Sequence, residues 1–142
     1  MTRDLPPLRL ESADRHSWVE IQPWTDATGM YSAFRMEAVV DYGHGKFTAQ
    51  NRDVQFMQIA EFSREFDQFI LDRSRTPVLC GTYDSHLGFA AVGLQVVVTF
   101  CIGDAFCGGL TSIEEPRLRS SFGVDSERLN DLNEYFRNLA SG

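Results

Sequence analysis

The side chains best suited to covalent chemistry in this sequence are its few cysteines and histidines. Cys80, Asp84 and His86 fall within one predicted hairpin, so a cysteine nucleophile with histidine as its base is one hypothesis. Reactive cysteines need positive surroundings, yet no lysine or arginine lies within four residues of Cys80, and Arg75 is the nearest. We therefore favour the other interpretation, a buried strand cysteine followed by a polar turn.

The spacing of these residues does not predict a metal site. The histidines are scattered, no pair stands at i and i+4, no Cys-x-x-Cys occurs, and five residues separate Cys101 from Cys107. Glu114 and Glu115 could form a general acid and base, but adjacent carboxylates in a loop before a proline are usually solvated. Nucleophile-elbow, phosphate-loop and dinucleotide motifs do not occur. We expect no metal, no cofactor and no catalytic residue.

An enzymatic alternative stays open. It is a small hydrolase or transferase whose site lies at the turns that carry His44 and His86, because histidine transfers protons readily near neutral pH. Replacement of either histidine by alanine should then abolish turnover.

Two loops, 24–31 and 103–106, favour recognition over catalysis, because the first holds Trp24 and Tyr31 with Asp26 and the second holds Phe106 with Asp104. Exposed aromatic and acidic loop residues are typical of binding surfaces. An equally weighted interpretation is that Trp24 and Phe106 fold back over the edges of the core. The predicted partner-binding residues are Trp24, Asp26, Tyr31, Asp104, Phe106, Glu114 and Glu115.

Composition narrows the class of partner. The chain has 142 residues, 43% of them hydrophobic, which predicts one globular domain spanning 1–142. Its net charge of −7, without a cluster of Lys and Arg, argues against nucleic acid and favours a basic protein partner. The odd count of three cysteines and the lack of a visible signal peptide predict a cytoplasmic protein. The longest apolar tract, Phe89–Ile102, is interrupted by polar residues and too short for a membrane helix.

Hydrophobic periodicity predicts an α+β fold. We expect an antiparallel sheet of about six to eight strands, with one long amphipathic helix packed on a face and a second helix at the C-terminus. The long helix should run from about Asp53, its N-cap, to Arg73, with the stripe of Phe62, Phe66 and Phe69 toward the sheet. The strands are expected at 8–11, 18–21, 34–41, 47–49, 78–83, 87–93, 95–102 and 117–122, and the last helix after Asp125 or Ser126.

Several short phrases resemble the WapI-type immunity proteins of bacteria. Leu8-Arg9-Leu10-Glu11-Ser12-Ala13-Asp14 is similar to the "L-x-L-E-S-x-D-G" phrase before a strand in that group, with Arg15 where the group usually has glycine. The segments ending in Val39-Val40-Asp41, from Phe47 to Asn51, from Gly93 to Val98 and after Val124-Asp125 follow the same order of elements. The resemblance implies a cytoplasmic partner that neutralises a toxin by binding it, and it carries over no site residues. A homodimer formed through an edge strand is a third hypothesis.

Overall fold

A four-stranded antiparallel meander opens the fold. The computed structural model describes residues 5–107 and 113–142. In the first sheet, β1 (Leu8–Glu11), β2 (Trp18–Thr25), β3 (Ser32–Asp41) and β4 (Lys46–Val54) pair in chain order. Leu10, Val19, Ile21 and Met36 are buried, and the residues between them face outward. The alternation in the sequence therefore sets which face of this sheet meets the core.

The second sheet has the order β10-β7-β6-β5. Its strands are β5 (Val78–Cys80), β6 (His86–Val92), β7 (Gln95–Gly103) and β10 (Arg117–Val124). A short ribbon of β8 (Phe106–Cys107) and β9 (Ile113–Glu114) lies between β7 and β10 in the chain. In this order β7 is an inner strand and β10 is an edge strand.

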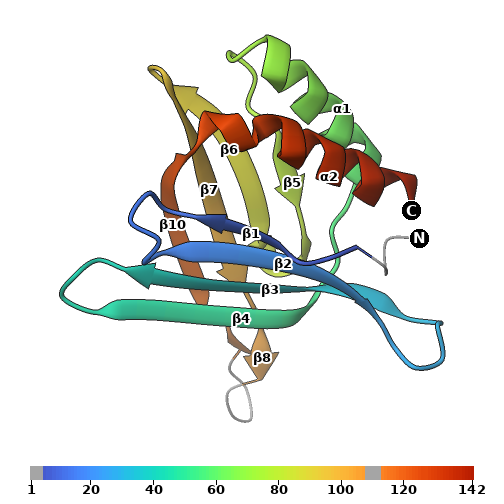
Figure 1. The fold of residues 1–142 in the computed structure, drawn as a ribbon. Helices are drawn as coiled ribbons and strands as arrows, with labels where there is room; N and C mark the ends of the chain where they lie inside the picture. The colour runs from blue at the N-terminus through green and yellow to red at the C-terminus, as the bar shows by residue number, and fades with distance from the viewer. Residues whose placement is uncertain (1–4, 108–112) are drawn as a thin grey trace.

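The antiparallel α+β prediction is confirmed, but the single sheet is wrong. The described strands form two four-stranded sheets, whose strands cross in Figure 1, together with the small β8–β9 ribbon. Alternation shows which side of a strand is apolar, whereas pairing partners depend on contacts distant in sequence. The helical segment between β4 and β5 separates the two sheets in the chain.

The predicted long helix is also corrected, because α1 runs only from Ile59 to Leu71. Asp53 is not its N-cap: it lies in β4, and Gln58, with a left-handed φ of 55°, precedes the helix. The second helix, α2 (Leu129–Ser141), has the same 13 residues as α1, so neither is the long one. Asp125 accepts a hydrogen bond from the Glu127 backbone and caps the 3₁₀ turn Ser126–Arg128 that leads into α2.

Both helices contribute aromatic rings to the core. The Phe66 ring of α1 meets Phe136 of α2 and Phe89 of β6, each at 5.0 Å between ring centroids. Figure 1 shows the two helices side by side against the second sheet. The Tyr135 hydroxyl of α2 donates to the Pro6 carbonyl, two residues before β1, at 2.8 Å. One hydrophobic cluster includes residues of both sheets and both helices. Burying each large apolar side chain contributes about 1.5–3 kcal/mol to stability.

Candidate functional site

The C-terminal end of β4 meets the second sheet at a polar junction. The Asn51 side-chain amide donates to the Gly103 carbonyl at 2.7 Å. Gln55, just after β4, exchanges hydrogen bonds of 3.1 Å with Thr82, in the turn between β5 and β6. The Ser85 hydroxyl contacts both backbone polar atoms of Gly103, at 3.0 and 3.3 Å. These bonds hold three chain segments in one place.

Trp24 and Tyr31 lie beside this junction on the β2–β3 hairpin. Their rings meet edge to face, 5.7 Å apart. The Tyr31 hydroxyl donates to the Asp53 carboxylate and accepts from the Gln55 amide at 3.0 Å. The hydrogen bond to Asp53 is the main reason that the pKa of Tyr31 is raised.

Trp24 itself belongs to a strand, since β2 extends to Thr25, whereas the predicted strand ended at residue 21. Its indole is half-buried, and its N–H donates to the Arg52 carbonyl at 2.8 Å.

The turn between β5 and β6 is conformationally strained. Tyr83 and Asp84 have consecutive left-handed φ values of 59° and 64°. Such conformations cost non-glycine residues energy, and they are enriched at functional sites. Asp84 is held by Arg117 at 3.3 Å and Arg119 at 2.6 Å. Tyr83 as a whole residue is 42% exposed, so the turn presents an aromatic residue beside the junction.

Asp26 has a local structural role. Its carboxylate accepts hydrogen bonds from the Thr28 hydroxyl at 2.8 Å and from the backbone N–H groups of Met30 and Tyr31 at 3.2 and 3.3 Å. The Thr28 bond is the largest cause of the lowered pKa of Asp26. Asp26 therefore organises the β2–β3 turn that carries Tyr31.

The second predicted loop lies next to the same junction. Asp104 is exposed and directly follows Gly103, the residue that Asn51 contacts. Its backbone N–H donates to the Pro116 carbonyl at 3.1 Å, and Glu115 is exposed beside that proline. The predicted residues Phe106 and Glu114 lie in β8 and β9, but their side chains are outside the described part of the structure. The fold thus brings Asp104 and Glu115 toward the Asn51 region of β4.

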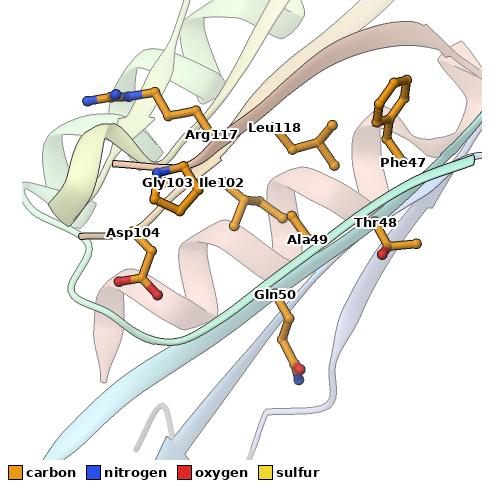
Figure 2. A pocket seen from close by; sticks show the side chains of 10 residues that line it. Phe47, Thr48, Ala49, Gln50, Ile102, Gly103, Asp104, Arg117 and Leu118 are labelled. Carbon is orange, nitrogen blue, oxygen red and sulfur yellow. The ribbon is translucent and has the colours of Figure 1, made fainter. Parts of the chain in front are cut away.

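Figure 2 shows a groove between β4 and the β7–β10 pair, with Asp104 at one end of its lining. Its volume is about 310 Å³. Ala49, Ile102 and Leu118 supply apolar lining, and Phe47 stands at one end with 57% exposure. Asp104 and Arg117 supply opposite charges at the other end, as Figure 2 shows.

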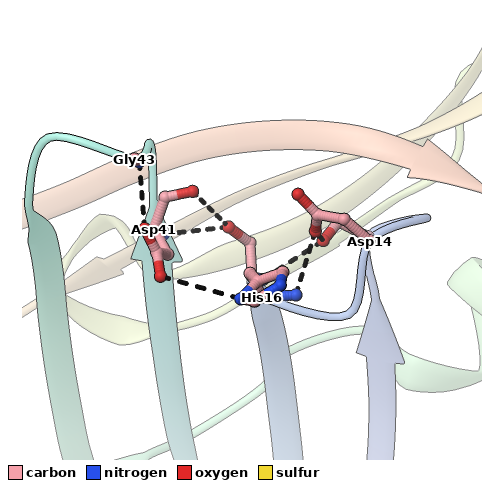
Figure 3. A network of polar contacts seen from close by, with 6 residues as sticks. Asp14, His16, Asp41 and Gly43 are labelled. Carbon is pink, nitrogen blue, oxygen red and sulfur yellow. Dashed lines mark hydrogen bonds and ion pairs between the residues drawn. The ribbon is translucent and has the colours of Figure 1, made fainter.

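The three histidines do not converge. His16 and Asp41 join the turns at the far end of the first sheet (Figure 3), with His16 Nδ1 3.9 Å from an Asp41 carboxylate oxygen. His44 lies exposed in the β3–β4 turn at that same end. His86 lies in the second sheet near Gly103, at the Asn51 end of β4, whereas His44 lies before the other end of that strand. The part of β4 from Lys46 to Asn51 alone spans about 17 Å. His44 and His86 therefore do not form one site.

Cys80 and His86 are directly opposed across β5 and β6, and Cys101 flanks His86 from β7. The Gly81 N–H bonds the Ser85 carbonyl at 2.7 Å, which makes Cys80 and His86 the closer, non-hydrogen-bonded kind of pair. Cys80 is exposed, so the predicted buried strand cysteine is wrong at this position. It occupies an edge strand of three residues, which alternation alone could not reveal. Cys101 is buried, and burial is the main cause of its raised pKa.

Sequence reasoning missed several junction residues. Asp53 had been interpreted as a helix cap, and Tyr83 and Gln55 had been given no role. The sequence placed Tyr83 at the end of the predicted strand 78–83, whereas it lies in the turn Thr82–Asp84. Its position beside the junction depends on the hydrogen bonds between Thr82 and Gln55, two residues far apart in the chain.

Comparisons with family models, curated proteins and solved structures found no match to this chain. Within residues 5–107 and 113–142, no group of three or more His, Cys, Asp or Glu side chains could hold a metal ion. No helix in the same described part is long and apolar enough to span a membrane. The immunity-protein resemblance and the cytoplasmic location stay predictions.

Proposed function

We propose that this chain is a non-enzymatic binding protein, of the kind that neutralises a toxin by direct contact with a basic partner. The observation that carries the proposal is the junction surface, which consists of Trp24, Tyr31, Asp53, Tyr83 and Asp104. It combines three aromatic side chains with two carboxylates, drawn from four separate segments of the chain. Partly exposed aromatic anchors on a rigid framework are typical of residues that dominate protein interfaces.

Charge supports a basic partner. Among the described residues, Asp26, Asp53, Asp104 and Glu115 form no ion pair with lysine or arginine. These acids lie around the junction surface on a chain of net charge −7. Unpaired carboxylates at the rim of an interface accelerate the approach of a positive surface.

The test begins with the neighbouring reading frames, where we expect a toxin domain. Binding of the purified toxin domain should weaken by about 2 kcal/mol or more, roughly thirtyfold, in Trp24→Ala or Tyr31→Ala. Calorimetric titration measures the affinity, and thermal unfolding measures the stability of the same variants. Unchanged affinity together with a large fall in melting temperature would assign Trp24 to the core and contradict the proposed surface.

Tyr42→Ala is the matched control, because Tyr42 is a 55% exposed aromatic residue at the opposite end of the first sheet. Its removal should leave affinity unchanged. Asp104→Lys and Glu115→Lys should slow association and weaken its salt dependence without affecting folding. The absence of a toxin in adjacent frames, together with a pull-down that recovers no partner, would count against the proposal.

A cysteine-dependent hydrolase or transferase is the second candidate, and the geometry at His86 favours it. His86 Nδ1 lies 3.0 Å from the Asp84 carbonyl oxygen. A carbonyl only accepts hydrogen bonds, so Nδ1 donates, and in the neutral ring Nε2 keeps the lone pair that could take the Cys80 proton. If hydrolysis of a panel of esters persists in the His86→Ala or Cys80→Ser variant, this candidate function is excluded. His44→Ala serves as the control, since His44 lies at the far end of the first sheet.

A further inference from the structure

The outward side of the first sheet carries a band of charged and aromatic residues. Val19, Ile21 and Pro23 of β2 are buried, so the alternate residues of the strand face away from the core. Neighbouring strands add arginines to the same side. The residues of this outer face that matter here are Arg9, Trp18, Glu20, Gln22, Trp24, Arg35 and Arg52.

Glu20 is shared by two arginines on this face. One carboxylate oxygen contacts Arg9 Nε at 2.9 Å, and the other contacts Arg35 Nη2 at 3.1 Å. The same Arg35 nitrogen also donates to the Gln22 side-chain oxygen at 2.8 Å. One negative charge therefore faces two positive charges, while the Arg35 guanidinium is held in a fixed position.

A β-bulge places Arg52 beside this group. Phe34 pairs with Val54 and Met36 with Asn51, so two residues of β4 oppose the single residue Arg35 of β3. Bulges change the direction of side chains and are enriched near functional sites. The Trp24 indole N–H holds the bulged backbone through the Arg52 carbonyl. In the described part of the chain, Arg52 forms no ion pair.

Gln22, Trp24, Arg35 and Arg52 line one pocket of about 330 Å³. Its lining combines two guanidinium groups, a side-chain amide and an indole, with no carboxylate. Arg35 shares the single charge of Glu20 with Arg9, and Arg52 forms no ion pair in the described part of the chain, so this lining keeps positive charge that a bound anion would neutralise. A guanidinium forms paired hydrogen bonds to phosphate or carboxylate, and an indole packs against flat rings.

The geometry points to a binding site for a small aromatic molecule that carries a phosphate or carboxylate group. The anionic group lies between Arg35 and Arg52, and the ring packs against Trp24. The volume suits a small molecule, since ligand pockets begin at about 300 Å³. This inference goes beyond the proposed toxin binding and does not depend on it: Trp24 belongs to both the pocket and the junction surface, but the two arginines that bind the anion belong only to the pocket.

The experiment follows the two tryptophan indole N–H signals by NMR while phenyl phosphate or benzoate is added. Trp18 is an internal control, because the Arg9 guanidinium covers its ring at 3.8 Å. We expect a saturable shift of the Trp24 signal and little change at Trp18. Arg52→Gln should weaken phenyl phosphate binding about tenfold or more, the loss expected for a charge-assisted hydrogen bond.

Arg64→Gln is the matched control, since Arg64 is an exposed arginine on α1, away from the outer face. It should leave the affinity unchanged, and benzyl alcohol, which has the ring without the charge, should not bind. Circular dichroism confirms that each variant is folded. Equal shifts with inorganic phosphate and phenyl phosphate, equal weakening in both arginine variants, or no saturable Trp24 shift would each overturn the inference.

Discussion

At the scale of single residues, Gly103 shows how tightly the junction is packed, and Cys80 shows how much exposure differs between neighbouring strands. A Cβ on Gly103 would lie 1.9 Å from the Tyr83 carbonyl oxygen, so the strained turn can approach β7 only at a glycine. Cys80 and Cys101 flank the same histidine, yet one is exposed and the other buried. These differences come from packing and lead to two predictions.

Gly103→Ala should destabilise the protein by about 1–3 kcal/mol, because backbone atoms must move to admit the methyl group. Urea unfolding measures the loss. Gly88→Ala is the control in the same sheet, since the nearest atom to its new methyl group would lie at an ordinary 3.4 Å. Equal stability of the two variants would show that the β5–β6 turn yields without cost.

Alkylation should separate the two cysteines. Iodoacetamide at neutral pH should modify Cys80 in the folded protein and leave Cys101 unmodified, because Cys101 is buried and its pKa is raised by that burial. Peptide mass spectrometry reads each site separately, and a sample unfolded in urea should be modified at both. Equal modification in the folded state would contradict the packing around Cys101.

At the scale of elements, the contact between the two helices depends on polar groups at its border. Asp67 of α1 accepts a hydrogen bond from the Asn133 amide of α2 at 3.0 Å and also pairs with Arg137. The Asn133 bond, followed by the Arg137 bond, lowers the pKa of Asp67 below its ordinary value of 3.8. These contacts therefore favour the ionised carboxylate and tie α1 to α2.

The helix contact should be sensitive to acid. A carboxyl group whose pKa is lowered by folding stabilises the folded state above its unfolded pKa and loses that contribution as pH falls through the folded pKa. Asp67→Asn should therefore lower the urea midpoint at about pH 7, and the difference from wild type should shrink at about pH 2.5. Asp131→Asn, an exposed position on α2, is the control. A difference that is the same at both pH values would show that the charge of Asp67 does not contribute.

At the scale of the whole molecule, the free strand edges decide whether copies of the chain associate. β1 and β5 are short edge strands of four and three residues. β4 is longer but carries the bulge, Lys46 and Arg52, and β10 carries Arg117 and Arg119. Bulges and charged side chains on an edge oppose strand pairing between molecules.

We therefore expect a monomer in solution rather than the edge-strand homodimer that the sequence left open. Size-exclusion chromatography with light scattering should give the mass of one chain at every concentration tested. The homodimer would instead be supported by a mass of two chains that falls to one chain in a β4 variant. That variant carries proline at a position whose backbone N–H points outward from the sheet edge.

The sequence was a good guide to which faces are buried. Leu8, Leu10, Val19 and Ile21 alternate along two strands, and all are buried as that pattern predicts. The stripe of Leu129, Leu132, Phe136 and Leu139 likewise predicts the buried side of α2. Such patterns are local, because the repeat of a strand or helix sets which side chains share a face.

Only the tertiary structure decided which segments meet. Asp53 could equally cap a helix or extend a strand, and pairing with β3 made it part of β4 beside Tyr31. Two sheets form instead of one, and the turn that carries Tyr83 meets the end of β4 through Thr82 and Gln55, because hydrogen bonds and core contacts join segments distant in the chain. The hydrophobic period of a segment determines which way each side chain points, whereas the neighbours of that side chain depend on how all the elements pack together.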